Sequence, residues 1–587
     1  MRTFLLLLAL LASPAALSAP ADDPLGAATS IESPTLRALL IEHWGWTMAR
    51  HPRWATELGV PGHADRLFDA SAAAWAEDLG ARSGFLARLL ALDTEALSTS
   101  DAHALRMLRL QLQDGLARAV CRDHEWSLSP RDNPIVEFSD LPESHPLNTA
   151  ADAEALLARY RAIPRAVEQR TTNLRRGLAS GRVATAETVR RTIVQARAAL
   201  AAPLADQPLL ALQGTDTLVH STTHKATPLV RDAILPALVR FTDFLEAEVL
   251  PLARPAGAEG LLNVPDGRLC YAARVRSQTT TDQSPQVLHA LGLKELERIH
   301  AEFRRIGGTE FGTNDLAAIF ERLRSDKSLY FETSEEVEAA ANRALQRAAA
   351  VIPQAFGRLP QAECTVRPIP AHEAPFTTIA YYQRPRPATG KPGEYFVNTY
   401  APTTRPRYEA EVLAFHEAIP GHHLERSLSI ELADSPAFIK NGGFTAFIEG
   451  WALYSERLSD ELGLYSGDID RLGMLSFDAW RASRLVVDTG IHHFGWSRQQ
   501  AMDFLAANTP LAANNIDNEV DRYISWPGQA LAYKVGQLEI LALRAQAEQA
   551  LGASFDRSAF HDLVLGGGAM PLPLLRARVE AWIASKR

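Results

Sequence analysis

The feature that most constrains the fold is a stretch of more than two hundred residues in which apolar side chains recur at helical spacing. From about Ser33 the chain is rich in Ala, Leu and Arg, with charged residues between the apolar ones. Such a pattern gives each segment one apolar face, which is typical of amphipathic helices packed around a core. The sequence therefore predicts long helices over residues 71–92, 101–121, 151–178 with a break at Pro164, 186–202 and 230–250.

A first interruption of the helical pattern lies between Gly260 and Ser277, where Gly, Pro and aromatic residues gather. A helix is expected to restart at Ser284-Pro285, because Ser suits the N-cap and Pro suits the first turn. We take the interruption as a boundary between two regions that pack as one unit. The predicted organisation is a signal peptide (1–19), a linker (20–32), an N-terminal helical region (33–259) and a catalytic region (260–587).

A second interruption covers residues 365–407, which are rich in Pro and Tyr. Two β-favouring runs, 377–382 and 395–400, are separated by a turn-forming segment and predict a small hairpin. Helices are expected from Tyr408 to the C-terminus, with breaks at Pro510 and near Pro527-Gly528. The expected fold is therefore mainly α, with a small β-hairpin or sheet near the active site.

The composition places the chain among globular proteins and excludes one class of partner. Hydrophobic residues make up 47% and charged residues 22% of the chain, so a packed interior is feasible. The formal net charge is -9, and no run of Lys or Arg is longer than a pair. A protein that holds a nucleic acid backbone needs a basic surface, so nucleic acid is not expected as a partner.

The N-terminus predicts export. Arg2 is followed by an apolar run over residues 4–12 and then by small residues up to Ala19, which is the pattern of a secretory signal peptide cleaved near Ala19. The run is too short to cross a bilayer, which takes roughly 20 residues, so no stable membrane insertion is expected. No cysteine lies nearby to carry a lipid, and the mature protein is expected to be periplasmic or secreted.

The three cysteines give no sign of a metal site, because Cys121, Cys270 and Cys364 are far apart and form no CxxC motif. We expect them to be buried apolar residues, although an oxidising compartment would permit one disulfide.

The chemistry of the chain centres on His416-Glu417-Ala418-Ile419-Pro420-Gly421-His422-His423. Zinc in catalytic sites takes about three His or carboxylate ligands and keeps one position open, and a Glu beside the first His can act as general base. The usual spacing of the two His on a helix is HExxH. Here the second His comes two or three residues later than in that motif.

Two residues compete to be the second ligand. On a regular helix His422 would lie about 120° from His416, whereas His423 would lie only about 20° away. The helix cannot be regular, because the ring of Pro420 clashes with the carbonyl of His416, and Gly421 frees the chain to re-aim the next side chain. A kinked segment of the HExGH type with two extra residues favours His422, and His423 stays open as the alternative.

The third ligand is expected on a separate helix, at Glu449. Its neighbours are nearly uncharged, and a carboxylate in such surroundings is costly unless a proton, a cation or a metal neutralises it. Glu456 lies seven residues on, on the same helical face, and is expected to hydrogen-bond a ligating His.

These motifs resemble those of the bacterial "domain of unknown function 885" family, which is grouped with the gluzincin metallopeptidases. The resemblance rests on residues 416–423 and 449–456, extends to 484–492, 522–523 and 527–536, and is weaker over 271–280. It implies a largely helical fold similar to the cleft-forming peptidases of that clan. It also implies one Zn²⁺ held by His416, His422 and Glu449, with Glu417 as general base. Glu425 departs from the Gln expected in many relatives.

Peptide hydrolysis also needs a donor for the oxyanion that develops in the transition state. The candidates are Tyr523, Tyr533 and His492. A substrate's terminal carboxylate could be bound by Arg484, Arg522 or Lys534, with Arg481 as a less favoured choice.

The strand expected over residues 395–400 would offer an edge to an extended peptide, which would place Asn398 among the substrate contacts. His423 is also counted on the substrate side if it is not a ligand. The predicted function is thus a zinc peptidase for short peptides, a carboxypeptidase or dipeptidase. The alternatives are a non-peptidase zinc amide or ester hydrolase and a catalytically silent peptide-binding protein. The sequence does not indicate the oligomeric state.

Overall fold

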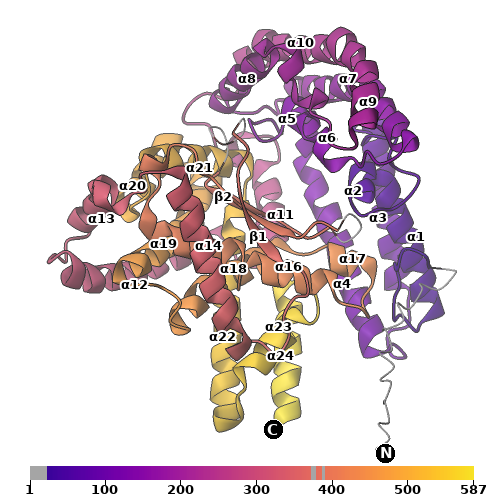
Figure 1. Cartoon of the computed structure of the whole chain (residues 1–587). Coiled ribbons are helices and arrows are strands. Elements are labelled where there is room, and N and C mark those ends of the chain that lie inside the picture. Colours follow the sequence, from indigo (N-terminus) through magenta and orange to yellow (C-terminus); the bar gives the residue numbers. More distant parts are fainter. Residues whose placement is uncertain (1–22, 372–373, 375–377, 387–389) are drawn as a thin grey trace, which may run out of the picture.

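The chain folds into a mainly helical structure with one small sheet near its centre (Figure 1). The computed structural model describes residues 23–371, 374, 378–386 and 390–587. The predicted signal peptide therefore lies outside the described residues. Within the described ranges, no helix has the length and apolar character needed to cross a membrane.

The N-terminal half confirms the long helices expected from the periodicity. Several begin at a Ser or Thr whose side chain accepts a hydrogen bond from the first turn, including Ser71, Ser98 and Thr185. The helices are α1 (Pro34–Arg50), α2 (Pro52–Glu57), α3 (Ala72–Leu90), α4 (Thr99–Ala117), α5 (Pro134–Ser139), α6 (Leu141–Ser144), α7 (Ala150–Ser180), α8 (Ala186–Ala201), α9 (Asp216–Leu229) and α10 (Leu235–Phe244).

The predicted break at Pro164 is wrong, because α7 runs through this residue without interruption. Ile163 and Val167, on either side of the proline, are both buried in the core. Their packing, with a capping box at Thr149, offsets the hydrogen bond that Pro164 cannot make.

The interruption expected between residues 260 and 277 is also only partly correct, because α11 (Gly267–Thr279) occupies most of it. Gly260 and Pro265 precede the helix, whereas Cys270, Tyr271 and Val275 form a buried helical face. The restart at Ser284 is confirmed, since its side chain caps the next helix. The helices that follow are α12 (Pro285–Glu310), α13 (Leu316–Ser325) and α14 (Ser334–Val351).

The sheet contains the predicted hairpin and one strand that was not predicted. Strands β2 (Ala380–Gln383) and β3 (Gly393–Val397) pair antiparallel, with Tyr382 opposite Tyr395. β1 (Cys364–Pro368) pairs parallel to β3, which gives the order β1-β3-β2. The expectation that the later hairpin strand forms an edge is therefore wrong, because β3 is central and the edges are β1 and β2.

The C-terminal helices carry the predicted site. Their breaks at Pro510 and at Pro527-Gly528 are confirmed, because helices end just before both points. The helices are α15 (Ala410–Glu417), α16 (His422–Ile430), α17 (Ala437–Asn441), α18 (Thr445–Glu461), α19 (Asp468–Thr489), α20 (Arg498–Asn508), α21 (Ala513–Ser525), α22 (Ala532–Leu551), α23 (Arg557–Leu565) and α24 (Leu572–Lys586).

Two helices of this half approach each other unusually closely. A Cβ added at Gly450 of α18 would lie 2.4 Å from the Cα of Gly536 in α22, and one at Gly536 would lie 1.8 Å from the carbonyl oxygen of Ala446. The two glycines therefore allow a crossing that larger residues would exclude. This crossing places Glu449 near the beginning of α22.

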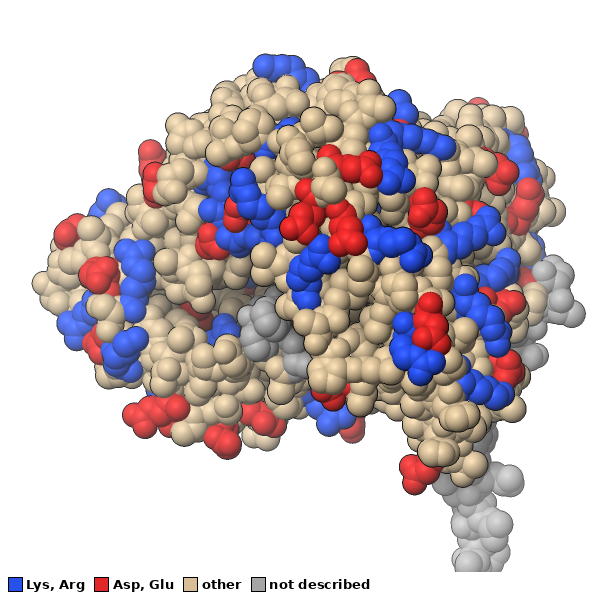
Figure 2. Space-filling model, turned by 90° about the horizontal axis from the view of Figure 1, so that it is seen from above, with Lys and Arg blue, Asp and Glu red and all other residues tan. Residues whose placement is uncertain are grey.

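The buried apolar residues form cores that link distant parts of the chain. Helices α1, α3 and α4, on the right of Figure 1, share a core with α22, α23 and α24 at its foot. Helices α5 to α10, which arch over the top, enclose a core of their own. The surface seen from above mixes acidic and basic side chains and shows no large basic field (Figure 2).

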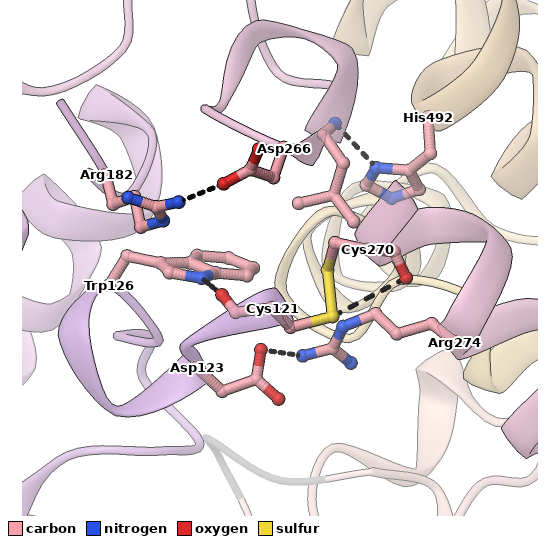
Figure 3. The surroundings of a disulfide bond; sticks show 9 residues. Cys121, Asp123, Trp126, Arg182, Asp266, Cys270, Arg274 and His492 are labelled. Atoms are coloured by element: carbon pink, nitrogen blue, oxygen red, sulfur yellow. Dashed lines mark hydrogen bonds and ion pairs between the residues drawn. A yellow bond between two sulfur atoms is a disulfide. The ribbon is translucent and has the colours of Figure 1, made fainter. Parts of the chain in front are cut away.

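A disulfide joins the two halves of the chain and corrects the expectation for two of the cysteines. Cys121 and Cys270 are bonded across a separation of 149 residues, and Cys364 is free. The disulfide ties the segment after α4 to α11 (Figure 3). Beside it Trp126 Nε1 donates to the Cys121 carbonyl oxygen at 2.9 Å, and Arg274 pairs with Asp123 at 2.6 Å.

Candidate metal centre

The segment with the His-Glu motif is broken where the sequence predicts it. α15 ends at Glu417 and α16 begins at His422, so the four residues between them leave the helix. The carbonyl oxygen of Pro420 accepts hydrogen bonds from Trp451 Nε1 at 2.9 Å and from Ser455 Oγ at 3.1 Å, which fix the break against α18. A Cβ at Gly421 would lie 1.9 Å from the carbonyl oxygen of His416, so only glycine fits there.

The break brings together two histidines and one carboxylate. One ligand atom from each of His416, His422 and Glu449 can be chosen such that all lie within 4.8 Å of one another. Glu449 Oε2 lies 3.8 Å from His416 Nε2 and 3.4 Å from His422 Nε2. Ligands of a tetrahedral zinc ion, bound at about 2.0–2.2 Å, are separated by about 3.4 Å. The two distances from Glu449 are thus close to the separation of zinc ligands.

The environment of the three side chains also fits a metal. Glu449 Oε2 is buried, and it makes no hydrogen bond with the described residues. Side-chain exposure rises from 4% for His416 to 12% for His422 and 18% for Glu449, so the cluster is accessible from one side. Two imidazoles and a carboxylate are a donor set that suits zinc and leaves one position for substrate or water.

Glu456 orients the first histidine, as expected from its position on α18. His416 Nδ1 donates to Glu456 Oε1 at 2.8 Å, which leaves Nε2 facing Glu449 and His422. Burial, with the nearby His422 and three arginines, lowers the pKa of His416 well below its ordinary value, so its ring is neutral. A carboxylate in this position fixes the tautomer of a metal-binding histidine.

Glu417 lies at the end of α15, directly after the first histidine. Burial raises the pKa of its carboxyl group to about 7, and the charge of Glu449 adds to this effect. Tyr395 of β3 is fully buried nearby, and its hydroxyl group has no hydrogen-bond partner among the described residues. The sequence did not identify Tyr395, because nothing in its local pattern distinguishes it from a core tyrosine.

His423 lies apart from the cluster, and of the two candidate histidines it is His422 that lies beside His416 and Glu449. His423 Nε2 donates to the Ala362 carbonyl oxygen at 3.0 Å, and its Nδ1 accepts from the hydroxyl of Tyr382 at 3.0 Å. A Cβ at Gly393 would lie 2.4 Å from His423 Nδ1, so the ring packs directly on β3. His423 therefore docks α16 onto the sheet, and we do not keep it as a substrate contact.

Of the two predicted tyrosines, Tyr533 is the one beside the histidine cluster. Its ring stacks on that of His416 with centroids 6.4 Å apart, and its hydroxyl oxygen accepts from Arg522 Nη2 at 2.8 Å. The Tyr523 hydroxyl accepts from Trp480 Nε1 at 2.9 Å and from Arg484 Nε at 3.2 Å. Tyr523 is thus held inside an aromatic and cationic cluster, and Tyr533 is the better placed oxyanion donor.

His492 has both ring nitrogens bound to backbone. Its Nε2 donates to the Tyr523 carbonyl oxygen at 3.0 Å, and its Nδ1 accepts from the amide of Leu261 at 3.1 Å (Figure 3). Burial lowers its pKa to about 3, so the ring stays neutral. With both nitrogens engaged, His492 connects three segments of the fold and is not retained as an oxyanion donor.

The predicted cationic residues divide into two groups. Lys534 is fully buried against Asp478 and Gln537, so it is not retained as a substrate contact. Arg484 and Arg522 lie beside Tyr533, with guanidinium carbons 4.3 and 5.8 Å from its ring centroid. Arg481, the less favoured choice, belongs to this group through its ion pair with Glu456 at 3.8 Å. The sequence contains a signal for this position of Arg481, because residues three apart on one helix, such as Arg481 and Arg484, lie on the same face.

Asn398 is buried, and its side chain is used within the fold. Its Nδ2 donates to the carbonyl oxygens of Ala374 and Thr378 at 2.8 and 3.0 Å, and its Oδ1 accepts from the Tyr400 amide at 3.0 Å. These bonds use both donors of the amide group and one of the two lone pairs of its oxygen. Asn398 therefore shapes the chain around the hairpin and is not kept as a substrate contact.

Solved structures that share this fold include the following two. A crystal structure described as that of "the putative lipoprotein from Colwellia psychrerythraea" matches with a TM-score of 0.88 and 24% identity, over 94% of this chain and 99% of the other. A second, described as "a putative lipoprotein of unknown function from Shewanella oneidensis", matches with a TM-score of 0.71 and 19% identity, over 92% and 98%. At these identities the likeness shows the fold alone.

No curated protein matches the chain. The family described as "Bacterial protein of unknown function (DUF885)" matches residues 52–579. This range includes the histidine and glutamate motifs and nearly every helix described above. The chain therefore belongs to the DUF885 family of bacterial proteins.

Proposed function

We propose that the protein is a zinc-dependent peptidase that hydrolyses short peptides. The observation that carries this proposal is the convergence of His416, His422 and Glu449, from three helices, with a general-base candidate beside the first histidine. Among the described residues Glu449 Oε2 makes no hydrogen bond and lies 3.4 Å from His422 Nε2, which leaves this oxygen able to bind a metal.

The three side chains would hold one Zn²⁺ through His416 Nε2, His422 Nε2 and a Glu449 oxygen. Bound there, the ion would supply Lewis acidity, which polarises a carbonyl group and makes a water molecule more acidic. Glu456 would keep His416 in the tautomer that presents Nε2, through the hydrogen bond at 2.8 Å.

The remaining chemistry belongs to Glu417 and Tyr533. The Glu417 carboxylate would accept a proton from the attacking water and return it to the leaving amine. Tyr533 already accepts a hydrogen bond from Arg522, so its own hydroxyl hydrogen is available to an oxyanion beside His416. Because β3 is the central strand, a substrate backbone could pair only with an edge strand of the sheet. Of the two edge strands we propose β2 for this contact.

We also propose that the protein works outside the cytoplasm. The apolar run at the N-terminus, the disulfide between Cys121 and Cys270, and the description of two structural neighbours as lipoproteins support this location. Fractionation of cells that express the full chain tests it. We expect the protein in the periplasmic or secreted fraction, and a wholly cytoplasmic protein would contradict the location.

A digest of mixed synthetic peptides, read by mass spectrometry, tests the activity. The zinc-loaded protein should cleave peptides, and a chelator should abolish cleavage. Glu417→Gln should keep its zinc and lose activity, which separates catalysis from binding. Peptides that remain intact while simple esters or other amides are hydrolysed would favour the non-peptidase alternative. Zinc-loaded protein that binds peptides without cleaving any substrate would indicate a silent binding protein.

A further inference from the structure

Three arginines form a cluster next to the candidate metal centre. Arg481 and Arg484 lie on α19, and Arg522 lies on α21. Arg481 and Arg484 are 4% and 2% exposed, and the side chain of Arg522 is 16% exposed. Such burial is costly for a guanidinium group unless its hydrogen-bond donors are satisfied.

The donors of these arginines are not all satisfied by the protein. The buried nitrogens without a hydrogen-bond partner among the described residues are Arg481 Nε and Nη1, Arg484 Nη1 and Arg522 Nε. Some buried arginines are fully bonded: Arg544, for example, binds Glu461, Glu548 and the hydroxyl of Tyr454. Others, such as Arg182, also leave a buried nitrogen unpaired, so what distinguishes the present cluster is that three such arginines lie together beside the candidate metal centre.

The charges in this cluster do not balance either. Arg484 and Arg522 share one carboxylate, Glu519, at 2.9 and 3.4 Å. Arg481 has only the 3.8 Å ion pair with Glu456, whose Oε1 already accepts the hydrogen bond from His416. In salt bridges the three guanidinium groups are thus paired with two carboxylates, in a largely buried position that suits an anionic ligand.

The cluster lies at a short distance from the candidate metal ligands. Tyr533 stands between them, with its ring centroid 6.4 Å from that of His416 and 4.3 Å from the Arg484 guanidinium carbon. These two distances set an upper limit of about 11 Å between the His416 ring and that guanidinium. One extended residue spans about 3.3–3.6 Å, so the upper limit corresponds to about three residues. The contact distances from the ring to the scissile carbonyl and from the guanidinium to the anion take up part of this length, which leaves room for one or two residues between carbonyl and anion.

We propose that Arg481, Arg484 and Arg522 bind the free C-terminal carboxylate of the substrate, and that the enzyme removes one or two residues from that end. This inference rests on the proposed peptidase function and deepens it. Guanidinium groups bind a carboxylate with two parallel hydrogen bonds, which fixes the peptide as well as holding it. Arg481 offers two unpaired nitrogens and is the principal contact.

A pair of peptides that differ only at the C-terminus tests the proposal on the unmodified protein. One N-acetylated peptide carries a free carboxylate, and the other carries an amide. We expect kcat/KM to be roughly 10- to 100-fold higher for the free acid, which is the range of charge-assisted hydrogen bonds in a buried site. Mass spectrometry should show the loss of one or two C-terminal residues. Equal rates, or cleavage at bonds unrelated to the C-terminus, would overturn the proposal while leaving the peptidase function intact.

Inhibition gives a second test that needs no variant. An N-acetyl amino acid should inhibit competitively, whereas its amide should inhibit at least about tenfold more weakly. Equal inhibition by both compounds would count against the arginine site. If the zinc-loaded protein cleaves neither peptide of the pair and no peptide of the mixed digest, the peptidase function itself fails, and this proposal fails with it.

Arg481→Gln should lower the ratio of acid to amide rates toward one without loss of zinc. Arg471→Gln is the matched control, since Arg471 lies on the same helix and pairs with Asp460 and Asp468 away from the cluster. It should keep the wild-type ratio. A folded Arg481→Gln protein that keeps both its zinc and the wild-type ratio would refute the role of Arg481. If this variant does not fold, the peptide pair and the inhibitors still test whether the protein binds the C-terminal carboxylate, because both use the unmodified protein.

Discussion

The close crossing of α18 and α22 gives a sharp prediction about what positions the third metal ligand. Gly450 follows Glu449, and a Cβ at this position would lie 2.4 Å from the Cα of Gly536. An ordinary contact needs about 3.4 Å. Gly450→Ala must therefore push the helices apart by about 1 Å, because the opposing atom is backbone and cannot rotate away.

A shift of this size exceeds what a metal site tolerates. Metal–ligand distances are normally kept within about 0.2 Å, so a displaced Glu449 should weaken zinc binding by an order of magnitude or more. Overpacking of this kind also costs roughly 1–3 kcal/mol of stability. We expect Gly450→Ala to lose zinc to a competing chelator at lower chelator concentrations than the wild type, and to unfold at a lower temperature.

Gly45→Ala is the matched control. Gly45 lies in α1, and a Cβ there would meet no atom within 4 Å. The control should be as stable as the wild type or more stable by up to about 1 kcal/mol, because alanine favours a helix over glycine. If Gly450→Ala keeps wild-type zinc affinity and stability, the crossing does not position Glu449, and our reasoning about this helix pair is refuted.

Further predictions concern the base, the histidine partner, the disulfide and one buried acid. Glu417→Gln should lower kcat by roughly 10²- to 10⁴-fold at unchanged zinc content, as measured by steady-state kinetics. Glu456→Gln should weaken zinc affinity by roughly 10- to 100-fold in a chelator competition, and unchanged affinity would exclude its orienting role. Replacing Cys121 and Cys270 by Ser should lower the free energy of unfolding by up to about 5 kcal/mol, because the disulfide closes a loop of 149 residues. Burial raises the pKa of Asp488 to about 7, so the folded state binds the proton of this carboxyl group more tightly than the unfolded state does. The protonated carboxyl group therefore stabilises the fold at low pH, and this stabilisation is lost as the pH rises from about 4 to about 7. Asp488→Asn should therefore reduce the loss of unfolding free energy over that range, and an identical slope in denaturant titrations would contradict the assignment.

Much of the fold followed from local patterns in the sequence. Amphipathic spacing identified the long helices, and Ser284 marked the start of α12. The failures came from tertiary packing. α7 continues through Pro164 because buried neighbours hold the helix on both sides, and β1 was missed because its partner strand lies 25 or more residues along the chain.

The candidate site divides in the same way. Pro420 and Gly421 indicated a broken helix, and this break is what brings His422 rather than His423 to His416. The roles first suggested for His492 and Lys534 depended on which way each side chain points in the fold. Residue type alone could not show that both ring nitrogens of His492 bind backbone groups, or that Lys534 faces Asp478.

The metal content of the purified protein is the most direct test of the central claim. Elemental analysis of the wild type should find about one zinc per chain, in line with three protein ligands and an open fourth position. His416→Ala, His422→Ala and Glu449→Ala should each lose the metal, whereas His423→Ala should retain it wherever it folds. Wild-type protein that binds no zinc after incubation with the metal, or zinc that persists when two of the three ligands are removed, would contradict the account.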